Sequence, residues 1–301
     1  MGDLSDPFSF SIEGPGDDYF DGIALFTTTN QNNWSMANRL DAVGSNFVNA
    51  INRLPLFVEG TGIQYYGDYF TNAQYSWVRR LESGTPQDTN NNVNDFVLVS
   101  PNGSLTAGSR TINTILGAPG PENSNSPTQS NATVKASLID PQQPSTASPN
   151  RERDTTPVSN GALGTLTIRR KFTNKTGQTV TRLRFRIVDI TTLNSPGGPQ
   201  ADLRALDSVN VSVPVTGGGT ISVKGTTIEQ PPAQTSGGGL NSTMVVALPA
   251  PLGANANVTV QFVLGVQQGG NFRFLVNVEA ITAPPPGAQK LGGQRPGKRI
   301  D

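Results

Sequence analysis

Apolar and polar residues alternate along much of the chain from Leu163 to Ile281, and a period of two residues predicts β-strands rather than helices. The pattern is clearest from Val258 to Val266, where apolar residues fill every second position. Glycine-rich turns separate seven runs of this kind, at residues 163–172, 183–187, 209–215, 221–228, 244–248, 258–266 and 272–278. Seven strands joined by turns predict a two-sheet sandwich of the Ig-like or fibronectin-like type.

The first two of these strands are expected to form a hairpin, with Asn174-Lys-Thr-Gly177 as the turn between them. On the second strand three apolar residues alternate with three arginines, Arg182, Arg184 and Arg186. If the two strands pair, Arg169 and Lys171 add their charges to the same sheet face. Acidic partners are then expected, from Asp189, Asp207, Glu279 or another subunit. This face is either a solvated surface with scattered ion pairs or a docking interface.

Shorter apolar runs precede this part of the chain, at residues 8–12, 22–26, 75–78 and 96–99, and each is bounded by Gly, Asp or Asn. They predict a first, smaller β domain. Between them, residues 34–54 have apolar positions at roughly helical spacing, interrupted by Gly44 and several asparagines. A short helix and a pair of strands are both compatible with that segment.

Residues 101–160 have a different composition, rich in Pro, Ser, Asn and Thr, with Val134–Ile139 as the single strand-like stretch. Such a segment is expected to be a flexible linker or a locally packed connector. Alternatively it is an extended arm whose strand-like stretch joins an exposed sheet edge. The predicted architecture is all-β. Two Ig-like or fibronectin-like sandwich domains, at 1–100 and 161–282, are joined by a connector at 101–160 and followed by a flexible basic tail at 283–301.

The composition excludes several classes of chemistry. The chain has no Cys and no His, so thiolate chemistry, disulfides and histidine-based catalysis or metal binding are ruled out. The formal net charge is zero and 15% of residues are charged, which argues against nucleic acid as a partner. No run suits membrane insertion, and the first residues lack the pattern of a secretion signal. The abundance of Gly, Asn, Thr, Ser and Pro is nevertheless typical of extracellular and cell-surface β proteins.

Oxygen-bearing side chains alternate through the stretch from Asp88 to Asp95, with Asn90 and Asn92 between them. Alternating oxygen ligands are how a loop binds calcium, so these four residues are the candidate metal site and calcium the candidate cofactor. The EF-hand pattern is not met, because Val93 stands where that loop needs glycine. The other explanation is a turn rich in Asn and Asp, since both tolerate left-handed backbone conformations.

Aromatic residues gather just before this stretch, at Tyr65, Tyr66, Tyr69 and Trp77. They are either a platform for sugars or another partner, or packing within a strand pair. No arrangement of residues suggests a catalytic site, and the protein is predicted not to be an enzyme.

Two resemblances add to this interpretation. The residues Asp21-Gly-Ile-Ala-Leu-Phe26, Tyr75-Ser-Trp-Val-Arg-Arg80 and the Asp88–Phe96 turn resemble the later part of a bacterial lamin-tail-type domain, an extracellular Ig-like sandwich. The resemblance covers residues 20–100. The opening strands of that family have little room before Ile23, so either residues 8–12 supply a first strand or the sandwich exposes an edge.

The second half, at about residues 160–282, is similar to C-terminal β-sandwich modules of very large bacterial cell-surface proteins. The similarity is carried by Thr167–Asn174, Val180–Thr192 and Leu264–Gln268. It implies location and architecture, with no activity attached.

Together these observations predict a non-catalytic extracellular structural protein, a filament, sheath or surface-layer unit that assembles through β-strand edges. Its partners are then copies of itself or neighbouring β domains. Two alternatives stay open. One is an adhesin or carbohydrate-binding module that uses the aromatic residues, and the other is a virion surface protein.

Overall fold

The computed structural model describes residues 22–46, 55–64, 73–82, 85–120, 133–193 and 200–282. These residues form β-strands in several sheets with almost no helix, which confirms the all-β class. The exceptions are one short α-helix and two 3-10 turns: α1 (Asn92–Asp95), η1 (Gln31–Asn33) and η2 (Pro55–Phe57). No helix within the described ranges is long and apolar enough to cross a membrane. The assignment of two Ig-like domains stays a prediction.

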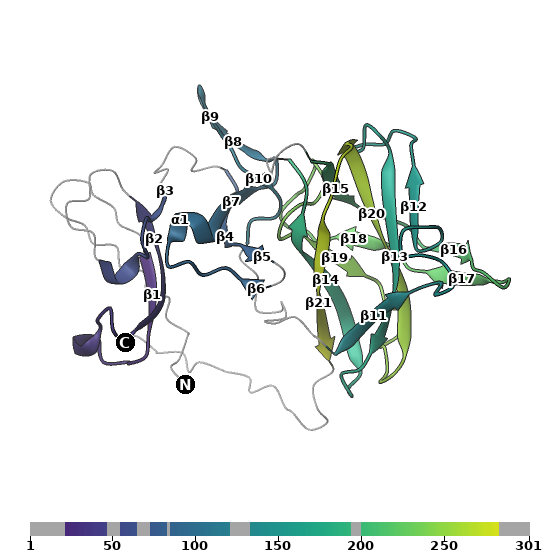
Figure 1. Ribbon diagram of the computed structural model, residues 1–301, viewed down its shortest axis with the longest axis horizontal. Helices are drawn as coiled ribbons and strands as arrows, with labels where there is room; N and C mark the ends of the chain where they lie inside the picture. Colours follow the sequence, from purple (N-terminus) through teal and green to yellow (C-terminus); the bar gives the residue numbers. More distant parts are fainter. Residues whose placement is uncertain are drawn as a thin grey trace, which may run out of the picture.

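Two sheets face each other in the C-terminal part, hereafter the sandwich (described residues 133–282; Figure 1). The first sheet has the order β11-β13-β20-β15, and β12 also pairs with β13. Its strands are β11 (Val134–Leu138), β12 (Arg151–Asp154), β13 (Thr165–Asn174), β15 (Asp202–Leu206) and β20 (Asn257–Gln268). The second sheet has the order β18-β19-β14-β21. Its strands are β14 (Val180–Ile190), β18 (Thr226–Ile228), β19 (Thr243–Val246) and β21 (Phe274–Thr282). A small hairpin, β16 (Val211–Pro214) and β17 (Thr220–Val223), lies beside the first sheet.

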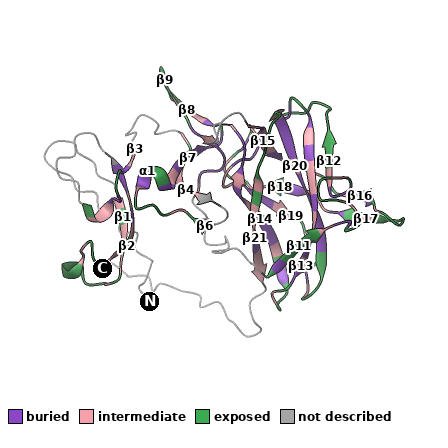
Figure 2. Cartoon of the chain, viewed as in Figure 1, coloured by how far each residue is buried: buried purple, intermediate pink, exposed green. Residues whose placement is uncertain are grey.

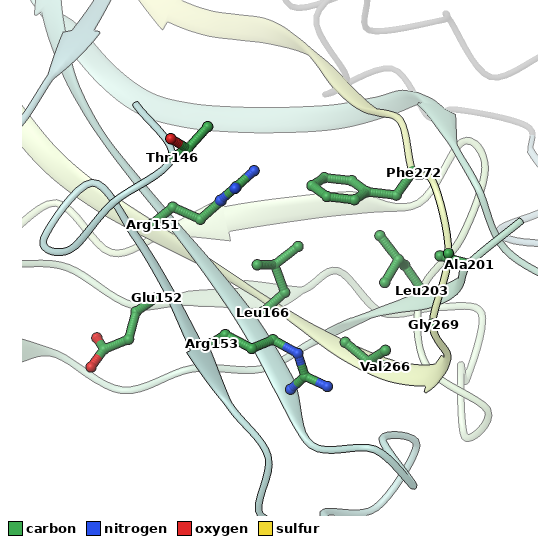
Figure 3. Close-up of a pocket in the computed structure, with 11 residues that line it drawn as sticks. Thr146, Arg151, Glu152, Arg153, Leu166, Ala201, Leu203, Val266, Gly269 and Phe272 are labelled. Atoms are coloured by element: carbon green, nitrogen blue, oxygen red, sulfur yellow. The ribbon is translucent and has the colours of Figure 1, made fainter. Parts of the chain in front are cut away.

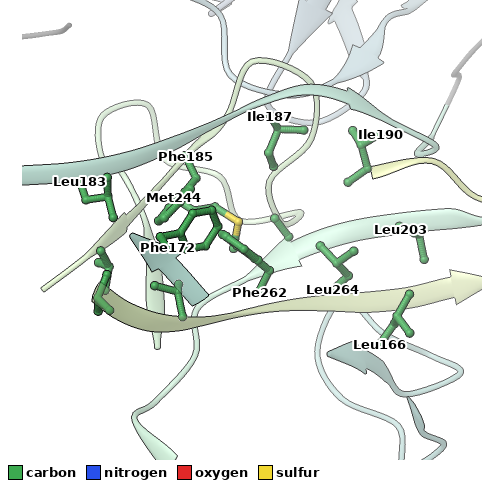
Figure 4. Packing of buried hydrophobic residues seen from close by; sticks show 14 of the residues in the cluster. Leu166, Phe172, Leu183, Phe185, Ile187, Ile190, Leu203, Met244, Phe262 and Leu264 are labelled. Carbon is green, nitrogen blue, oxygen red and sulfur yellow. The ribbon is translucent and has the colours of Figure 1, made fainter. Parts of the chain in front are cut away.

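The core of the sandwich is built from the apolar faces of both sheets (Figures 2 and 4). Phe172 and Phe185 lie 4.7 Å apart between ring centroids, and Phe185 and Phe262 lie 4.9 Å apart. The five alternating residues from Val258 to Val266 are all buried in this core. The prediction for this strand is therefore confirmed.

The predicted hairpin between the first two strands is wrong, because β13 and β14 belong to different sheets. β13 pairs with β20 and β14 pairs with β21. Both strands have a buried apolar face, and the two faces meet across the core, where Phe172 contacts Phe185. A hairpin would place those faces side by side in one sheet and leave the core half empty. Arg169 and Lys171 consequently lie in the other sheet from the three arginines of β14, and the expected face with five positive charges does not form.

Two further strands differ from the prediction. The run at 221–228 is divided between β17 and β18, and Gly225 marks the break. A Cβ atom at Gly225 would lie 2.1 Å from the carbonyl oxygen of Ser208, so the chain passes another segment too closely for any side chain. The strand β15 was not predicted, although Leu203 and Ala205 alternate with polar residues along it.

Part of the segment expected to be a connector belongs to the sandwich. β11 and β12 both pair antiparallel with β13, one after the other along its length. The backbone between them is held by the side chain of Asn150, whose Nδ2 donates to the carbonyl oxygen of Asp140 (2.8 Å). Its Oδ1 accepts from the backbone N–H of the same residue (3.0 Å). The proposal that Val134–Ile139 adds a strand to a sheet edge therefore describes this chain better than a plain linker does.

The N-terminal region (described residues 22–120) contains smaller sheets. One has the order β1-β2-β3, and another has the order β10-β7-β4. Two short hairpins, β5–β6 and β8–β9, accompany them. The strands are β1 (Gly22–Phe26), β2 (Arg39–Asn46), β3 (Ile63–Gln64), β4 (Ser76–Arg79), β5 (Leu81–Glu82), β6 (Thr85–Pro86), β7 (Phe96–Ser100), β8 (Ser104–Ala107), β9 (Arg110–Asn113) and β10 (Ile115–Leu116). Within the described part of residues 34–54, strand β2 forms and pairs with β1, in place of a helix. Residues 8–12 lie outside the described ranges.

The N-terminal region lies beside the second sheet of the sandwich, and the two are joined through their main chains (Figure 1). The N–H of Leu240 donates to the carbonyl oxygen of Leu116 (2.9 Å), and the N–H of Ala118 donates to that of Leu240 (3.0 Å). Gly117 and Gly239 allow this approach. A Cβ atom on either glycine would lie 2.0 Å from the carbonyl oxygen opposite it, Leu240 or Leu116 respectively.

Candidate functional site

The Asp88–Asp95 stretch is a loop that ends in α1 and docks against β2 and the segment after η2. Its anchor is Asn92, which is fully buried. The Asn92 Oδ1 accepts from the backbone N–H groups of Gly44 (3.0 Å) and Glu59 (3.1 Å), and its Nδ2 donates to the carbonyl oxygen of Ala42 (2.7 Å). One amide thus satisfies backbone groups of two separate segments, which fixes the position of the loop.

Three carboxylates meet where the loop touches that segment. Glu59, Asp88 and Asp95 each contribute one oxygen, and these oxygens lie within 4.8 Å of one another. Glu59 and Asp95 are buried, and Asp88 is exposed. Buried carboxylates this close repel one another unless protons or cations compensate their charge. We call these three residues the carboxylate cluster.

The loop itself supplies hydrogen bonds that stabilise the charge of Asp95. Its two oxygens accept from the backbone N–H groups of Thr89 (3.0 Å) and Asn91 (3.3 Å) and from the side chain of Gln87 (3.3 Å). Burial alone would raise the pKa of Asp95, but these hydrogen bonds outweigh it and hold the pKa below its ordinary value. Asp95 is therefore ionised at neutral pH.

Glu59 has the opposite environment. Burial raises the pKa of Glu59, and the negative charges of Asp41 and Asp88 raise it further, against the lowering effect of Arg39 and Arg79. Arg39 lies 3.4 Å from the Glu59 Oε1. The other oxygen, Oε2, is buried and has no hydrogen-bond partner among the described residues.

Two of the four residues predicted to bind calcium, Asp88 and Asp95, lie in the carboxylate cluster. Asn92 is used for backbone hydrogen bonds, and Asn90 is exposed with a positive φ of 56°, as expected of an Asn in a turn. Glu59 was not predicted, because it lies almost thirty residues before the loop. The one signal for it in the sequence is an isolated acidic residue between Val58 and Gly60, which by itself specifies no partner.

The three arginines of β14 form an ion-pair network that is buried at its centre. Arg182 and Arg184 both pair with Glu229, and Arg184 and Arg186 both pair with Glu279. Glu279 is 1% exposed and Arg184 is 4% exposed, so both are buried, and the neighbouring positions Leu183 and Phe185 on β14 face the core. The expected partner Glu279 is confirmed, whereas Asp189 pairs with Arg273 and Asp207 accepts a backbone hydrogen bond from Ile228. Glu229 was not predicted.

The candidate aromatic platform is only partly described. Tyr65, Tyr66 and Tyr69 lie outside the described residues. Trp77 lies on β4, packs against the small core of Leu98 and Leu105, and lines a pocket of about 360 Å³ together with residues of β1, β2, β3 and β7. Trp77 therefore has a packing role in the N-terminal region.

A groove that sequence reasoning missed opens into the core of the sandwich. It lies between the β11–β12 side of the first sheet and β21, and it has two halves of about 400 and 330 Å³. The halves share Thr146, Arg151 and Phe272, and the Arg151 guanidinium lies 5.9 Å from the centroid of the Phe272 ring. Figure 3 shows Arg151 directed toward Phe272, with Leu166, Leu203 and Val266 along one half.

The other half of this groove is more apolar. It is lined by core residues of both sheets, among them Phe172, Phe262, Phe274, Val276 and Val278. We call the whole feature the seam groove. The sequence gives little indication of this groove, because the same apolar residues would be expected in a sandwich whose two sheets close over the core without a gap.

Comparisons of the chain with protein-family models, with curated proteins and with solved structures find no match. The two resemblances drawn from the sequence stay predictions.

Proposed function

We propose that this protein is a non-catalytic, extracellular structural unit that assembles with copies of itself through the free edge of β21. The observation that carries the proposal is the combination of a nine-residue edge strand and an apolar groove beside it. Among the described residues β21 pairs on one side only, with β14. Long edges of this kind are templates for pairing with another chain unless charge, proline or a covering element blocks them.

The residues of β21 at the groove favour an added strand. Phe274, Val276 and Val278 pack at the border of the core, and Leu275 is 45% exposed. A strand placed beside them gains main-chain hydrogen bonds from β21 and buries its own apolar side chains against Phe172 and Phe262. Each fully buried side chain of that size contributes about 1.5–3 kcal/mol.

The occupant that we propose is the segment Phe8-Ser-Phe-Ser-Ile12 of a second copy. Its apolar residues stand at every second position, so one face of an extended strand presents two phenylalanines and an isoleucine. Five extended residues span about 17 Å, well within the length of β21. Because the donor and acceptor surfaces are different, such a contact is head-to-tail and generates filaments or rings.

The extracellular location rests on composition. The chain combines low charge with 33 glycines, 23 prolines and abundant Asn, Ser and Thr. A polymer on a cell surface needs neither a catalytic site nor a cofactor, and the absence of Cys and His leaves few catalytic chemistries open.

The test is the mass distribution of the purified chain, measured by size-exclusion chromatography with light scattering and by electron microscopy. We expect regular polymers from the full chain and monomers from a variant that lacks residues 1–21. A synthetic peptide covering residues 6–14 should bind the shortened variant and stop growth of the full chain. The same peptide with Phe8→Lys and Phe10→Lys is the matched control and should do neither.

Leu275→Lys supplies a second, independent variant. This side chain is already exposed, so the fold should tolerate the change, while a charge on the edge should weaken polymer growth. A full chain that stays monomeric, or a shortened variant that still forms polymers, would overturn the proposed contact.

Sugar binding is the second candidate, because Trp77 and Tyr75 both line the pocket of about 360 Å³ in the N-terminal region. Saturable glycan binding by the monomeric variant, lost in Trp77→Ala but not in Leu275→Lys, would favour it over assembly.

A further inference from the structure

We propose that the carboxylate cluster of Glu59, Asp88 and Asp95 is a calcium site that locks together the N-terminal region. This inference is independent of the proposed assembly, because none of the three residues lies near the seam groove and the site is tested on the monomer. It differs from the site predicted by sequence in its ligands, since Glu59 joins it and Asn92 does not.

The first argument is that the Glu59 carboxylate is buried with incomplete hydrogen bonding. Its side chain is 3% exposed, yet only Oε1 faces a cation, and that contact with Arg39 is 3.4 Å long. Oε2 is buried without any hydrogen-bond partner among the described residues. Buried polar atoms in folded proteins are almost always partnered, and a buried carboxylate oxygen without a partner is costly. Glu59 is one of the three residues of the cluster, so a cation bound there could take this carboxylate as a ligand.

The second argument is the spacing of the oxygens. Calcium binds oxygen ligands at about 2.3–2.6 Å, so two ligands on opposite sides of one ion lie about 4.6–5.2 Å apart. The three carboxylate oxygens lie no more than 4.8 Å from one another, so all three can reach one ion of that size. Magnesium, with bonds of about 2.0–2.1 Å, draws its ligands closer and needs near-ideal octahedral geometry. Calcium, with its more flexible coordination, is the ion that we propose.

The third argument is that the ligands are already in position. Asn92 holds the loop, and backbone hydrogen bonds hold Asp95. The side chain of Asn91 lies against Gly60, next to Glu59 in the chain, and its Oδ1 is buried without a hydrogen-bond partner among the described residues. Asp88 is exposed and gives the ion access from solvent. Water supplies the remaining ligands, as in other calcium sites.

A bound ion would join two separate parts of the N-terminal region. Glu59 follows η2 and lies next to β2, whereas Asp88 and Asp95 precede β7. The effect is a cross-link between two small sheets that have little apolar core between them. Calcium should therefore raise the stability of this region by mass action.

The alternative is that the cluster holds a proton. The charged groups that bear on Glu59 are Asp41, Asp88, Arg39 and Arg79, and burial together with the two acids raises its pKa. A proton shared with a neighbouring carboxylate would also satisfy Oε2. The two cases are separable, because a proton stabilises the region as pH falls and calcium stabilises it as calcium is added.

The experiment uses tryptophan fluorescence of the full chain, freed of metal with a chelator. The chain has only two tryptophans, Trp34 and Trp77, and both lie in the N-terminal region. We expect calcium at millimolar concentration to raise the midpoint of the fluorescence unfolding curve at pH 7, and magnesium to have a much smaller effect. Calorimetric titration with calcium chloride then gives the affinity.

Two variants test the ligands. Asp88→Asn should weaken calcium binding at least tenfold and leave the calcium-free protein folded, because the residue is exposed. Glu59→Gln should abolish the response. The matched control is Asp154→Asn. Asp154, like Asp88, is exposed and accepts a hydrogen bond from the backbone N–H two residues later, but it lies in the sandwich.

A midpoint that rises only with falling pH and ignores calcium would show that the cluster holds a proton, and the calcium site would be wrong. A calcium response that survives unchanged in both Asp88→Asn and Glu59→Gln would overturn it as well.

Discussion

The sandwich and the N-terminal region are each stabilised internally by a different kind of contact. The main core of the sandwich has nineteen buried apolar residues among those described, whereas the buried cluster of the N-terminal region consists of Leu98 and Leu105 with partly buried neighbours. The N-terminal region relies instead on polar contacts, such as Asn92 on three backbone groups and Arg79 on Asp41 (2.6 Å). Small sheets cannot bury much apolar surface, so directional bonds position them.

Buried polar atoms without partners show the same difference. Among the described residues such atoms include Ser45 Oγ, Ser76 Oγ, Glu59 Oε2 and Asn91 Oδ1, and none lies in the sandwich. A core built on apolar contacts has few groups to leave unsatisfied, while a region built on polar contacts depends on each of them. The N-terminal region is therefore the part in which a bound ion would change stability most.

The largest effect is expected from Phe262→Ala. Phe262 is 2% exposed and contacts Phe172, Phe185 and Phe274. Its truncation leaves a cavity and should lower the free energy of unfolding of the sandwich by about 4 kcal/mol. Urea unfolding followed by far-UV circular dichroism measures this loss, and tryptophan fluorescence should keep its midpoint. Two curves that shift together would show that the regions unfold as one unit.

Glu279→Gln should cost somewhat less, about 3 kcal/mol, because it leaves the buried Arg184 and the half-buried Arg186 beside an uncharged partner. The same circular dichroism experiment measures it. Glu152→Gln is the matched control. Its side chain is 52% exposed and pairs with Arg169, so its removal should cost about 1 kcal/mol or less. Equal losses in the two variants would contradict the contrast between a buried and an exposed carboxylate.

Asn92→Ala should lower the stability of the N-terminal region by about 2 kcal/mol, because the backbone N–H groups of Gly44 and Glu59 lose their acceptor. Tryptophan fluorescence should report the change, and far-UV circular dichroism of the sandwich should not. Asn94→Ala, at an exposed position of the same loop, is the control and should be nearly neutral. A neutral Asn92→Ala would mean that apolar packing carries this region too.

The smallest effect concerns pH. The pKa of Asp95 is lowered in the folded protein, so its contribution to stability is complete above the ordinary carboxyl pKa of about 4. That contribution is lost as the pH falls through the lowered value. In Asp95→Asn this part of the acid dependence of the fluorescence midpoint should disappear. An unchanged acid dependence in the variant would contradict the assignment.

The comparison also explains which features were predictable. Alternation along a strand identifies the residues that face the core, and from Val258 to Val266 it did so correctly. It does not identify the pairing partner, because a strand such as β14 has the same pattern whether it pairs with β13 or with β21. The hairpin prediction failed for that reason. The arginines of β14 were placed together correctly, but their second acidic partner, Glu229, follows a different strand.

In the N-terminal region the sequence is less informative. Asp88 and Asp95 were identified as candidate ligands from their spacing. The anchoring role of Asn92 and the approach of Glu59 depend on contacts between residues that are tens of positions apart, and no local pattern encodes them. The seam groove was missed because it lies where no described strand pairs with the outer edge of β21. No residue type in the sequence indicates that a sheet ends there.

The separation of β13 and β14 into different sheets has a consequence for how the chain is made. β14 pairs along its length with β21, the last described strand, and β13 pairs along its length with β20. Both partners are synthesised much later than the strands they pair with. Most of the sandwich is thus joined by pairings between distant segments, a topology that slows folding. Until β20 and β21 have left the ribosome, the apolar faces of β13 and β14 lack the core residues of those two strands. A chain that ended before residue 274 would leave one long side of β14 unpaired, with Arg184 and Arg186 lacking Glu279.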